Sequence, residues 1–116
     1  MTFKRKALGQ LGEDLACNYL QKKGYHLVGR NIRLFCGEID LLFQDKDTFV
    51  ICEVKTKSSQ KFGSPQEEVD FFKQRKLINL ARAILQKYPE KSVRIDVVAI
   101  YSETGEIEHI ISAVEE

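Results

Sequence analysis

The stretch Gly-Glu-Ile-Asp-Leu-Leu-Phe-Gln-Asp-Lys-Asp-Thr-Phe-Val-Ile-Cys-Glu-Val-Lys, residues 37–55, decides the fold. Two runs of apolar and β-branched residues bracket a polar, Asp-rich break, and this pattern predicts a β-hairpin. We place its turn at Lys46 and Asp47. Alternate side chains of a strand share a face, so the hairpin should have one apolar face, made of Ile39, Leu41, Phe43, Val50, Cys52 and Val54.

The other face of this hairpin is charged. The same register places Asp40 opposite Glu53, and Glu38 opposite Lys55. Like charges directly opposite each other destabilise a sheet, so a purely structural hairpin would gain nothing from the two facing acids. A divalent cation between Asp40 and Glu53 would turn this repulsion into a binding site.

Composition limits the class of protein. The chain has 116 residues, enough for one domain with a real core, and we expect a single domain over residues 1–116. Hydrophobic residues make up 43% and charged residues 30%, as in a soluble globular protein. The net charge is +1, so any surface that binds nucleic acid has to be a local basic patch.

The cysteines predict an intracellular, cytoplasmic protein. Cys17, Cys36 and Cys52 are odd in number, lack CxxC spacing and follow no signal peptide, which favours reduced thiols. A zinc site would need more ligands than these cysteines and two histidines offer. No apolar run approaches the roughly 18 residues that a membrane span requires.

Residues 4–23 have helical periodicity, with apolar side chains at Leu8, Leu11, Leu15 and Tyr19. Gly9 and Gly12 leave a bare flank on this helix, where another backbone or a ligand can approach closely. Glu13 lies at the edge of the apolar stripe. An ordinary, partly exposed helix glutamate is the alternative interpretation of Glu13.

A strand is expected over residues 25–35, where Arg30, Asn31 and Arg33 indicate an exposed face. A second helix is expected from Ser64, an N-cap in a capping box with Glu67, to about Tyr88. Its buried face should comprise Val69, Phe72, Leu77, Leu80, Ala81 and Ile84.

Two further strands are expected over residues 92–101 and 106–114, joined by a turn. Arg94 and Asp96 share a face of the first of these, and we interpret them as a structural ion pair at a sheet edge. The order α-β-β-β-α-β-β predicts an α/β fold, a mixed five-stranded sheet flanked by two helices, because a helix between strands allows a parallel crossover.

Asp40, followed after twelve residues by Glu53-Val54-Lys55, resembles the PD-(D/E)xK nuclease signature, with Ile39 where the signature has proline. A helix glutamate, Gly-Glu-Ile-Asp and Glu-Val-Lys together are similar to the small bacterial YraN-like proteins, which are predicted to be related to endonucleases. Archaeal Holliday-junction resolvases share the outline more distantly. The resemblance spans nearly the whole chain and also covers Gly12-Glu13, Asn31, Arg33, Phe62-Gly63, Lys73 and Arg94-x-Asp96.

The resemblance implies a restriction-endonuclease-like fold and a catalytic centre. Asp40 and Glu53 would hold Mg²⁺ or Mn²⁺, with the Val54 carbonyl and Glu13 as further ligands. Lys55 would position a water molecule or stabilise charge on the phosphate. Glu38 would orient Lys55 from the opposite strand. Arg33, Lys57, Lys73 and Lys76 would contact the phosphates of DNA.

Two functions follow from these observations. The first is a metal-dependent endonuclease acting on DNA, including branched or damaged DNA. The second is a nucleic-acid-binding module on the same fold that does not turn over substrate. A plain structural domain, in which the carboxylates form ion pairs, is a third and weaker interpretation. The sequence leaves a homodimer open.

Overall fold

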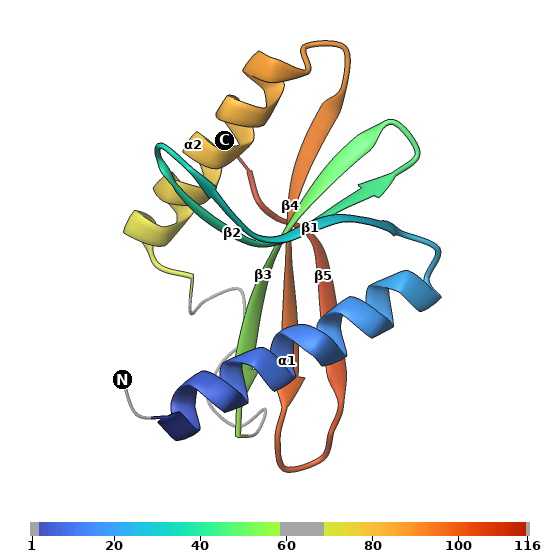
Figure 1. The fold of residues 1–116 in the computed structure, drawn as a ribbon, viewed down its shortest axis with the longest axis vertical. Coiled ribbons are helices and arrows are strands. Elements are labelled where there is room, and N and C mark those ends of the chain that lie inside the picture. The colour runs from blue at the N-terminus through green and yellow to red at the C-terminus, as the bar shows by residue number, and fades with distance from the viewer. Residues whose placement is uncertain (1–2, 59–68, 116) are drawn as a thin grey trace.

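The computed structural model describes residues 3–58 and 69–115, with side chains described from Gly9 onward. The described elements are α1 (Phe3–Lys22), β1 (His26–Leu34), β2 (Gly37–Asp45), β3 (Thr48–Lys57), α2 (Phe71–Lys87), β4 (Ser92–Tyr101) and β5 (Ile107–Val114). Their order is the one that the sequence predicts, and the α/β fold class is confirmed (Figure 1).

The five strands form one mixed sheet in the order β1-β2-β3-β4-β5. β3 and β4 are parallel, and the other neighbouring strands are antiparallel. The parallel pair requires a crossover, which α2 provides. The turn of the central hairpin lies at Lys46 and Asp47, because Asp45 pairs with Thr48, and this confirms the predicted register.

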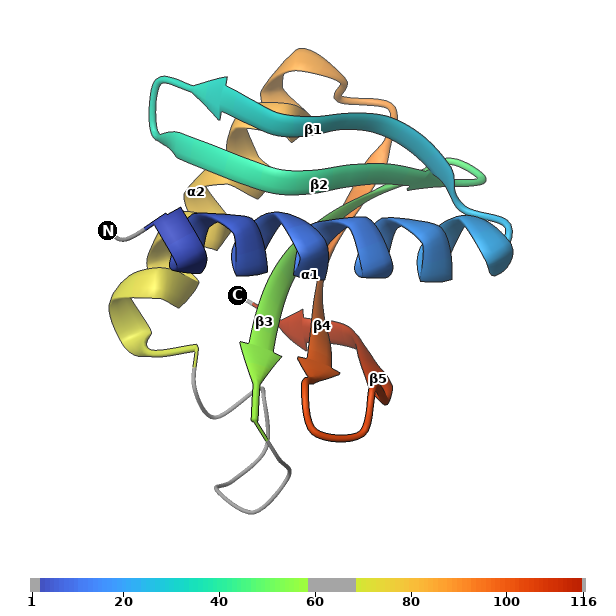
Figure 2. The same ribbon diagram turned by 60° about the horizontal axis from the view of Figure 1, so that its bottom comes forward.

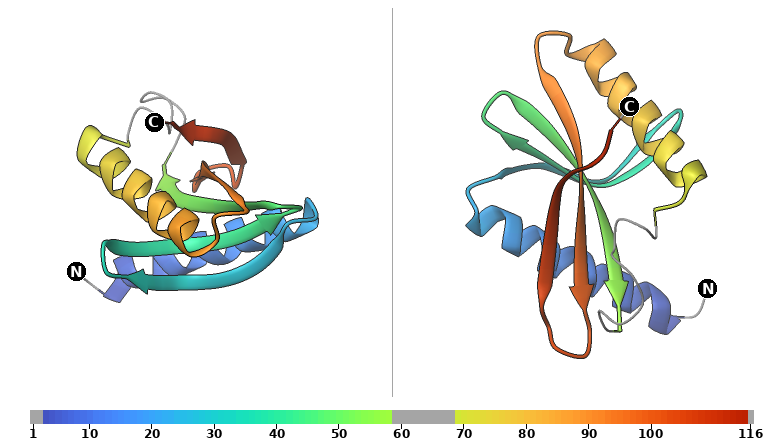
Figure 3. Two further views of the ribbon diagram at one scale, coloured as in Figure 1. Left: turned by 90° about the horizontal axis from the view of Figure 1, so that it is seen from above. Right: turned by 180° about the vertical axis from the view of Figure 1, so that it is seen from behind.

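The sheet separates two apolar cores, one beneath each helix (Figure 3). α1 runs nearly parallel to β1 and β2 and across β3 and β4 (Figure 2). The core beneath α1 contains Ala16, Cys17, Leu20, Leu41, Phe43, Val50, Cys52, Val98 and Ile100. The core beneath α2 contains Ile39, Leu42, Phe49, Ile51, Val69, Leu77, Leu80, Ile84, Ile95, Val97, Ala113 and Val114.

One residue of the predicted apolar face is on the opposite side of the sheet. Ile39 packs in the core beneath α2, although Leu41 packs beneath α1, so the alternation of side chains along β2 breaks at Asp40. The neighbouring strand changes in the same place, where Asn31 takes a left-handed φ of 51°. Asparagine tolerates this conformation better than most residues. The outer half of the β1–β2 hairpin is thereby turned toward α2, and Gly37 lies beside Leu80.

The start of the second helix also differs from the prediction. α2 begins at Phe71, and its N-cap is Asp70, whose carboxylate accepts a hydrogen bond from the Lys73 N–H. The predicted start at Ser64 and its capping partner Glu67 lie outside the described residues. Phe72 is 77% exposed and does not belong to the buried face, because the side of α2 that meets the sheet carries Leu77, Leu80 and Ile84, with Lys73 on the same side in contact with Glu53. No described helix is long and apolar enough to cross a membrane.

Candidate active site

Two carboxyl groups meet where β2 and β3 separate. The ladder between these strands ends at the pair Leu41–Cys52, so Asp40 and Glu53 lie just beyond its last rung. The Val54 N–H points at Asp40 and donates to its Oδ2 at 3.4 Å. Glu53 is only 6% exposed, and its side chain lies within hydrogen-bonding reach of Asp40. The predicted meeting of the two acids on adjacent strands is therefore present.

Burial is the main influence on this carboxyl pair. It raises the pKa of Asp40 and the pKa of Glu53 above their ordinary values, and the charge of Asp40 raises the pKa of Glu53 further. The Val54 N–H and the Lys73 ammonium act in the opposite direction on Asp40, but burial prevails. Two acids held together with raised pKa values favour a shared proton or a bound cation.

Lys73 places a positive charge beside the pair. Its Nζ lies 3.2 Å from Glu53 Oε1, and it reaches the site from the first turn of α2. The predicted role of Lys73 is a contact to a DNA phosphate. In the structure its described partner is a buried acid, although its side chain is still 39% exposed. The Lys73 side chain thus contacts a buried carboxylate and remains accessible to solvent.

Glu13 enters the same region from α1. Its side chain is 18% exposed, and burial followed by the charge of Asp40 raises its pKa. Glu13 Oε1 is buried and accepts no hydrogen bond from the described residues. Arg30 Nη2 lies 3.6 Å away from it, too far for a hydrogen bond. Glu13 is thus partly exposed, as the alternative interpretation has it, and its carboxylate also lies close enough to Asp40 for the charge of Asp40 to raise its pKa.

Gly12 allows this approach of α1 to the sheet. A Cβ atom at Gly12 would lie 2.6 Å from Thr56 Oγ1, whereas a Cβ at Gly9 would meet nothing within 4 Å. Arg30 then holds the helix from the other side, with Nη1 at 2.7 Å from Asp14 Oδ1. This role of Arg30 could not be predicted from the sequence, because it depends on how α1 packs against β1.

The position of Lys55 agrees with its predicted place in the site. Lys55 lies two residues beyond Glu53 on β3, is half-buried, and its charge lowers the pKa of Glu53. Glu38 is placed differently, since it pairs with Arg33 of β1, 3.8 Å away, and the β2–β3 ladder has ended before it could face Lys55. Glu38 is close enough to raise the pKa of Asp40 by its charge.

The other predicted phosphate contacts are spread over the surface and the interior. The Arg33 side chain is 86% exposed, and Lys76 is exposed on α2. Lys57 is only 9% exposed at the end of β3, so it has little surface to offer a DNA strand without a rearrangement.

The carboxylate oxygens of Asp40 and Glu53 are the type of ligand that a hard divalent cation prefers. Among the residues that the structure describes, no three His, Cys, Asp or Glu side chains are grouped closely enough to hold a metal ion by themselves. Mg²⁺ commonly uses one or two carboxylates together with waters and substrate phosphate. Asp40 and Glu53 would supply such a pair of oxygen ligands, and Glu13 is close enough to Asp40 for the charge of Asp40 to raise its pKa.

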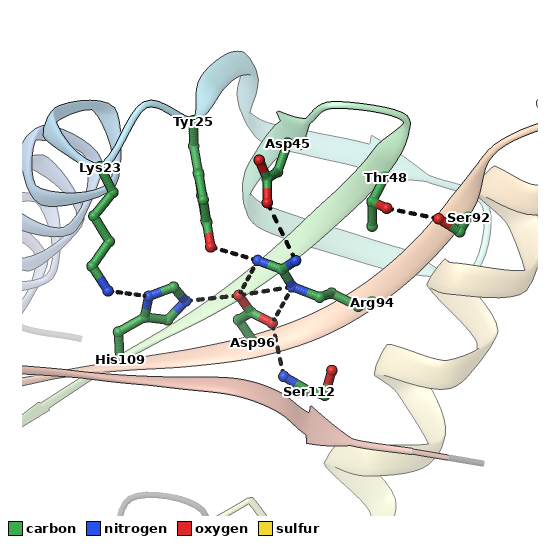
Figure 4. Close-up of polar contacts among 9 residues, drawn as sticks. All are labelled: Lys23, Tyr25, Asp45, Thr48, Ser92, Arg94, Asp96, His109 and Ser112. Carbon is green, nitrogen blue, oxygen red and sulfur yellow. Dashed lines mark hydrogen bonds and ion pairs between the residues drawn. The ribbon is translucent and has the colours of Figure 1, made fainter.

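A second polar cluster is centred on Asp96, which is fully buried (Figure 4). Its carboxylate accepts hydrogen bonds from Arg94 Nε at 3.1 Å, His109 Nε2 at 2.7 Å and the Ser112 N–H at 3.0 Å. β4 lies between β3 and β5, so the predicted location of the Arg94–Asp96 pair at a sheet edge is wrong. Its interpretation as a structural ion pair stands.

The same cluster joins distant elements. Arg94 donates to the Tyr25 hydroxyl at 2.6 Å and lies 3.5 Å from Asp45, and Lys23 contacts His109 at 2.9 Å. Only the Arg94-x-Asp96 spacing signalled this cluster in the sequence. The other members come from β2, from β5 and from the connection between α1 and β1, and the strand order has to be known before they can be associated.

The model of the uncharacterised protein family UPF0102 matches residues 12–100. The chain belongs to this family. It is a YraN-like, PD-(D/E)xK nuclease-like family, as the sequence resemblance indicated. The UPF0102 protein of Thermodesulfovibrio yellowstonii is 43% identical over 113 residues, covering 94% of this chain and 96% of its own. The UPF0102 protein of Caldanaerobacter subterraneus is 38% identical over 99 residues, covering 84% of this chain and 81% of its own.

Among solved structures, the chain is similar to SfsA of Pyrococcus furiosus in complex with Ca²⁺, with a TM-score of 0.42 and 17% identity. The similarity covers 97% of this chain and 65% of that chain, so the chain spans about two thirds of the length of SfsA.

Proposed function

We propose that this UPF0102 protein is a Mg²⁺- or Mn²⁺-dependent endonuclease that hydrolyses phosphodiester bonds of DNA, including branched or damaged DNA. The observation that carries the proposal is the close pair of half-buried Asp40 and buried Glu53, held together beside Lys55 where β2 and β3 separate. A binding-only surface has no use for two acids that repel each other at neutral pH. Oxygen ligands of this kind suit hard divalent cations.

Each residue has a distinct role in this reaction. Asp40 and Glu53 would hold the cation, with the Val54 carbonyl and Glu13 as supporting ligands. The bound cation would polarise the scissile phosphate and lower the pKa of a water molecule. Lys55 would orient that water and offset the negative charge that develops on the phosphate. The water gives up a proton to solvent as its oxygen forms a bond to phosphorus, the P–O bond to the leaving strand breaks, and the leaving oxygen takes up a proton from solvent.

A second function is favoured by one contact. Lys73 already supplies a positive charge to Glu53 at 3.2 Å, so the acids are partly neutralised without any metal. A non-catalytic nucleic-acid-binding module on the same fold would keep this ion pair permanently. The two proposals differ in what Lys55 does.

Lys55→Ala separates the two proposals. In an enzyme, the variant should keep most of its DNA affinity, because several basic residues share the phosphate contacts. It should lose cleavage by about a hundredfold or more, the usual loss when one preorganised catalytic group is removed. Lys22→Ala, an exposed lysine at the end of α1, is the matched control and should cleave like the native protein.

The assay compares linear, nicked, flapped and four-way DNA in Mg²⁺ and in Mn²⁺. Cleavage by the native protein and by Lys22→Ala, but not by Lys55→Ala, would support the enzyme. If the native protein cleaves none of these substrates, and Lys55→Ala only flattens the salt dependence of binding by about one ion, the binding module is correct.

A further inference from the structure

Two phenylalanines at the start of α2 are largely exposed to solvent. Phe71 is 68% exposed and Phe72 is 77% exposed. Their rings contact each other edge to face, with centroids 5.9 Å apart and an interplanar angle of 77°. Scattered exposed apolar residues need no explanation, but two adjacent aromatic rings form a contiguous apolar surface.

The position of this aromatic pair relates it to the candidate active site. Lys73 is the next residue, and its ammonium lies 3.2 Å from Glu53 Oε1. The backbone there is anchored, because Asp70 caps the helix through the Lys73 N–H at 2.9 Å. A ligand resting on the two rings would therefore lie at the start of α2, next along the chain to the lysine that contacts Glu53.

Two exposed cations lie near the rings along the helix. Arg75 and Lys76 follow Phe72 by three and four residues, about one helical turn, and the first turn of α2 contains no acidic residue. The cap Asp70 precedes the rings, and its carboxylate accepts the Lys73 N–H. Aromatic faces next to cations are the combination with which proteins bind single-stranded nucleic acid: the bases stack on the rings and the phosphates meet the cations. A protein partner would gain nothing from this arrangement of cations unless it were acidic.

We propose that Phe71 and Phe72 form a stacking surface for unpaired nucleobases, with Arg75 and Lys76 binding the phosphates of the same strand. This inference rests on the proposed nucleic-acid function and specifies its substrate class. The preferred substrate carries a single-stranded segment next to the scissile bond, such as a flap, a tail or an open branch point. A continuous duplex stacks its bases internally and offers none to the rings.

The test is a double-mutant cycle in which the aromatic rings are removed from the protein and the bases from the DNA strand. The binding affinity of each combination is measured in EDTA, so that no cleavage occurs. The native protein and Phe71→Leu/Phe72→Leu are titrated with a single strand, with the same strand carrying abasic residues, and with a blunt duplex. Leucine keeps an apolar surface but removes the aromatic face. Both side chains are exposed, so the variant should fold, and its unfolding midpoint is compared with that of the native protein.

The native protein should bind the intact strand about tenfold to a hundredfold more tightly than the abasic strand, because each stacked base contributes substantially to affinity. The Leu variant should bind both strands alike, and duplex binding should change less than twofold. Phe35→Leu is the matched control, since Phe35 is 93% exposed but lies beside the C-terminal half of α2 with Ala83 and Lys87. It should behave like the native protein.

Equal loss of single-strand and duplex binding in the Leu variant would overturn the inference. A native protein that binds intact and abasic strands alike, or binds neither, would also overturn it. So would a change in oligomeric state in the Leu variant, which would make the rings a contact between copies of the chain. The stacking surface and the nuclease activity can be refuted separately. Base-dependent binding without cleavage would support the stacking surface and refute the nuclease.

Discussion

At Asp40 and Glu53 the chain keeps two acids together in a place that water reaches poorly. A folded-state pKa above the ordinary value means that folding favours the protonated carboxyl group. Its stabilising effect is present below the ordinary pKa, 3.8 for Asp40, and is lost as the pH rises through the folded-state value. At neutral pH without a divalent cation, the ionised pair therefore costs stability.

Asp40→Asn should remove the loss of stability that the ionised pair causes at neutral pH. Asparagine keeps an oxygen that can accept from the Val54 N–H but carries no charge. We expect the variant to be more stable than the native protein at pH 7 in EDTA, and the difference to shrink as the pH falls through the raised folded-state pKa of Asp40 toward its ordinary value of 3.8. Urea unfolding across this range measures it. Asp47→Asn is the control, because the Asp47 side chain is 94% exposed, and equal stabilisation by both changes would contradict the prediction.

At the scale of an element, replacing each of the two glycines of α1 by alanine should change the stability of the protein in opposite directions. Gly9→Ala should stabilise the protein by up to about 1 kcal/mol, because alanine is the better helix former and its Cβ meets open space. Gly12→Ala should destabilise it by about 1–3 kcal/mol, the usual range for overpacking, because its Cβ would lie 2.6 Å from Thr56 Oγ1. Thermal unfolding of the two variants compares them directly, and stabilisation by Gly12→Ala would show that α1 does not pack this closely.

The cluster around Asp96 should hold several elements together. Burial alone would raise the pKa of Asp96, but hydrogen bonds from His109, Arg94 and the Ser112 N–H outweigh it and lower the pKa. The resulting stability is present above the ordinary pKa and is lost as the pH falls through the lower folded-state value.

Asp96→Ala should therefore cost about 3–5 kcal/mol at neutral pH, since it leaves the half-buried Arg94 and the buried His109 side chain without their common partner. Urea unfolding at pH 7 should show this loss of stability, and urea unfolding below pH 4 should show a smaller difference between the variant and the native protein. Asp47→Ala breaks only an exposed contact to Lys91 and should change stability by less than about 0.5 kcal/mol. A similar loss in both variants would mean that the cluster adds nothing beyond a surface pair.

The elements that could be predicted from the sequence are those set by local pattern. The central hairpin has its turn where the polar break predicts it, and the meeting of Asp40 and Glu53 follows from that register. Ile39 could not be assigned to its face, because the twist at Asn31 and Asp40 depends on packing against α2. The partner of Lys73 could not be predicted either, since it requires the distance between α2 and β3.

For the whole molecule, the test of the candidate site is a cation that stabilises the fold. A ligand that binds only the native state stabilises it by about 2.7 kcal/mol at a hundred times its Kd. We expect Mn²⁺ to raise the unfolding midpoint of the native protein, and Asp40→Asn or Glu53→Gln to abolish the rise. Thermal unfolding over a Mn²⁺ titration measures this. An equal rise in the native protein and in Asp40→Asn would locate the ion elsewhere.

The parallel pairing of β3 and β4 has a consequence for how the chain folds. The β2–β3 hairpin joins neighbouring residues and can form within microseconds. β4 has to close a much longer loop, since Thr48 meets Ser92, 44 residues away, and such non-local contacts form slowly. The nascent edge of β3 is therefore open before β4 docks, and its apolar residues are then available to other chains. We expect refolding yield to fall at high protein concentration, even though the finished sheet covers this strand on both sides.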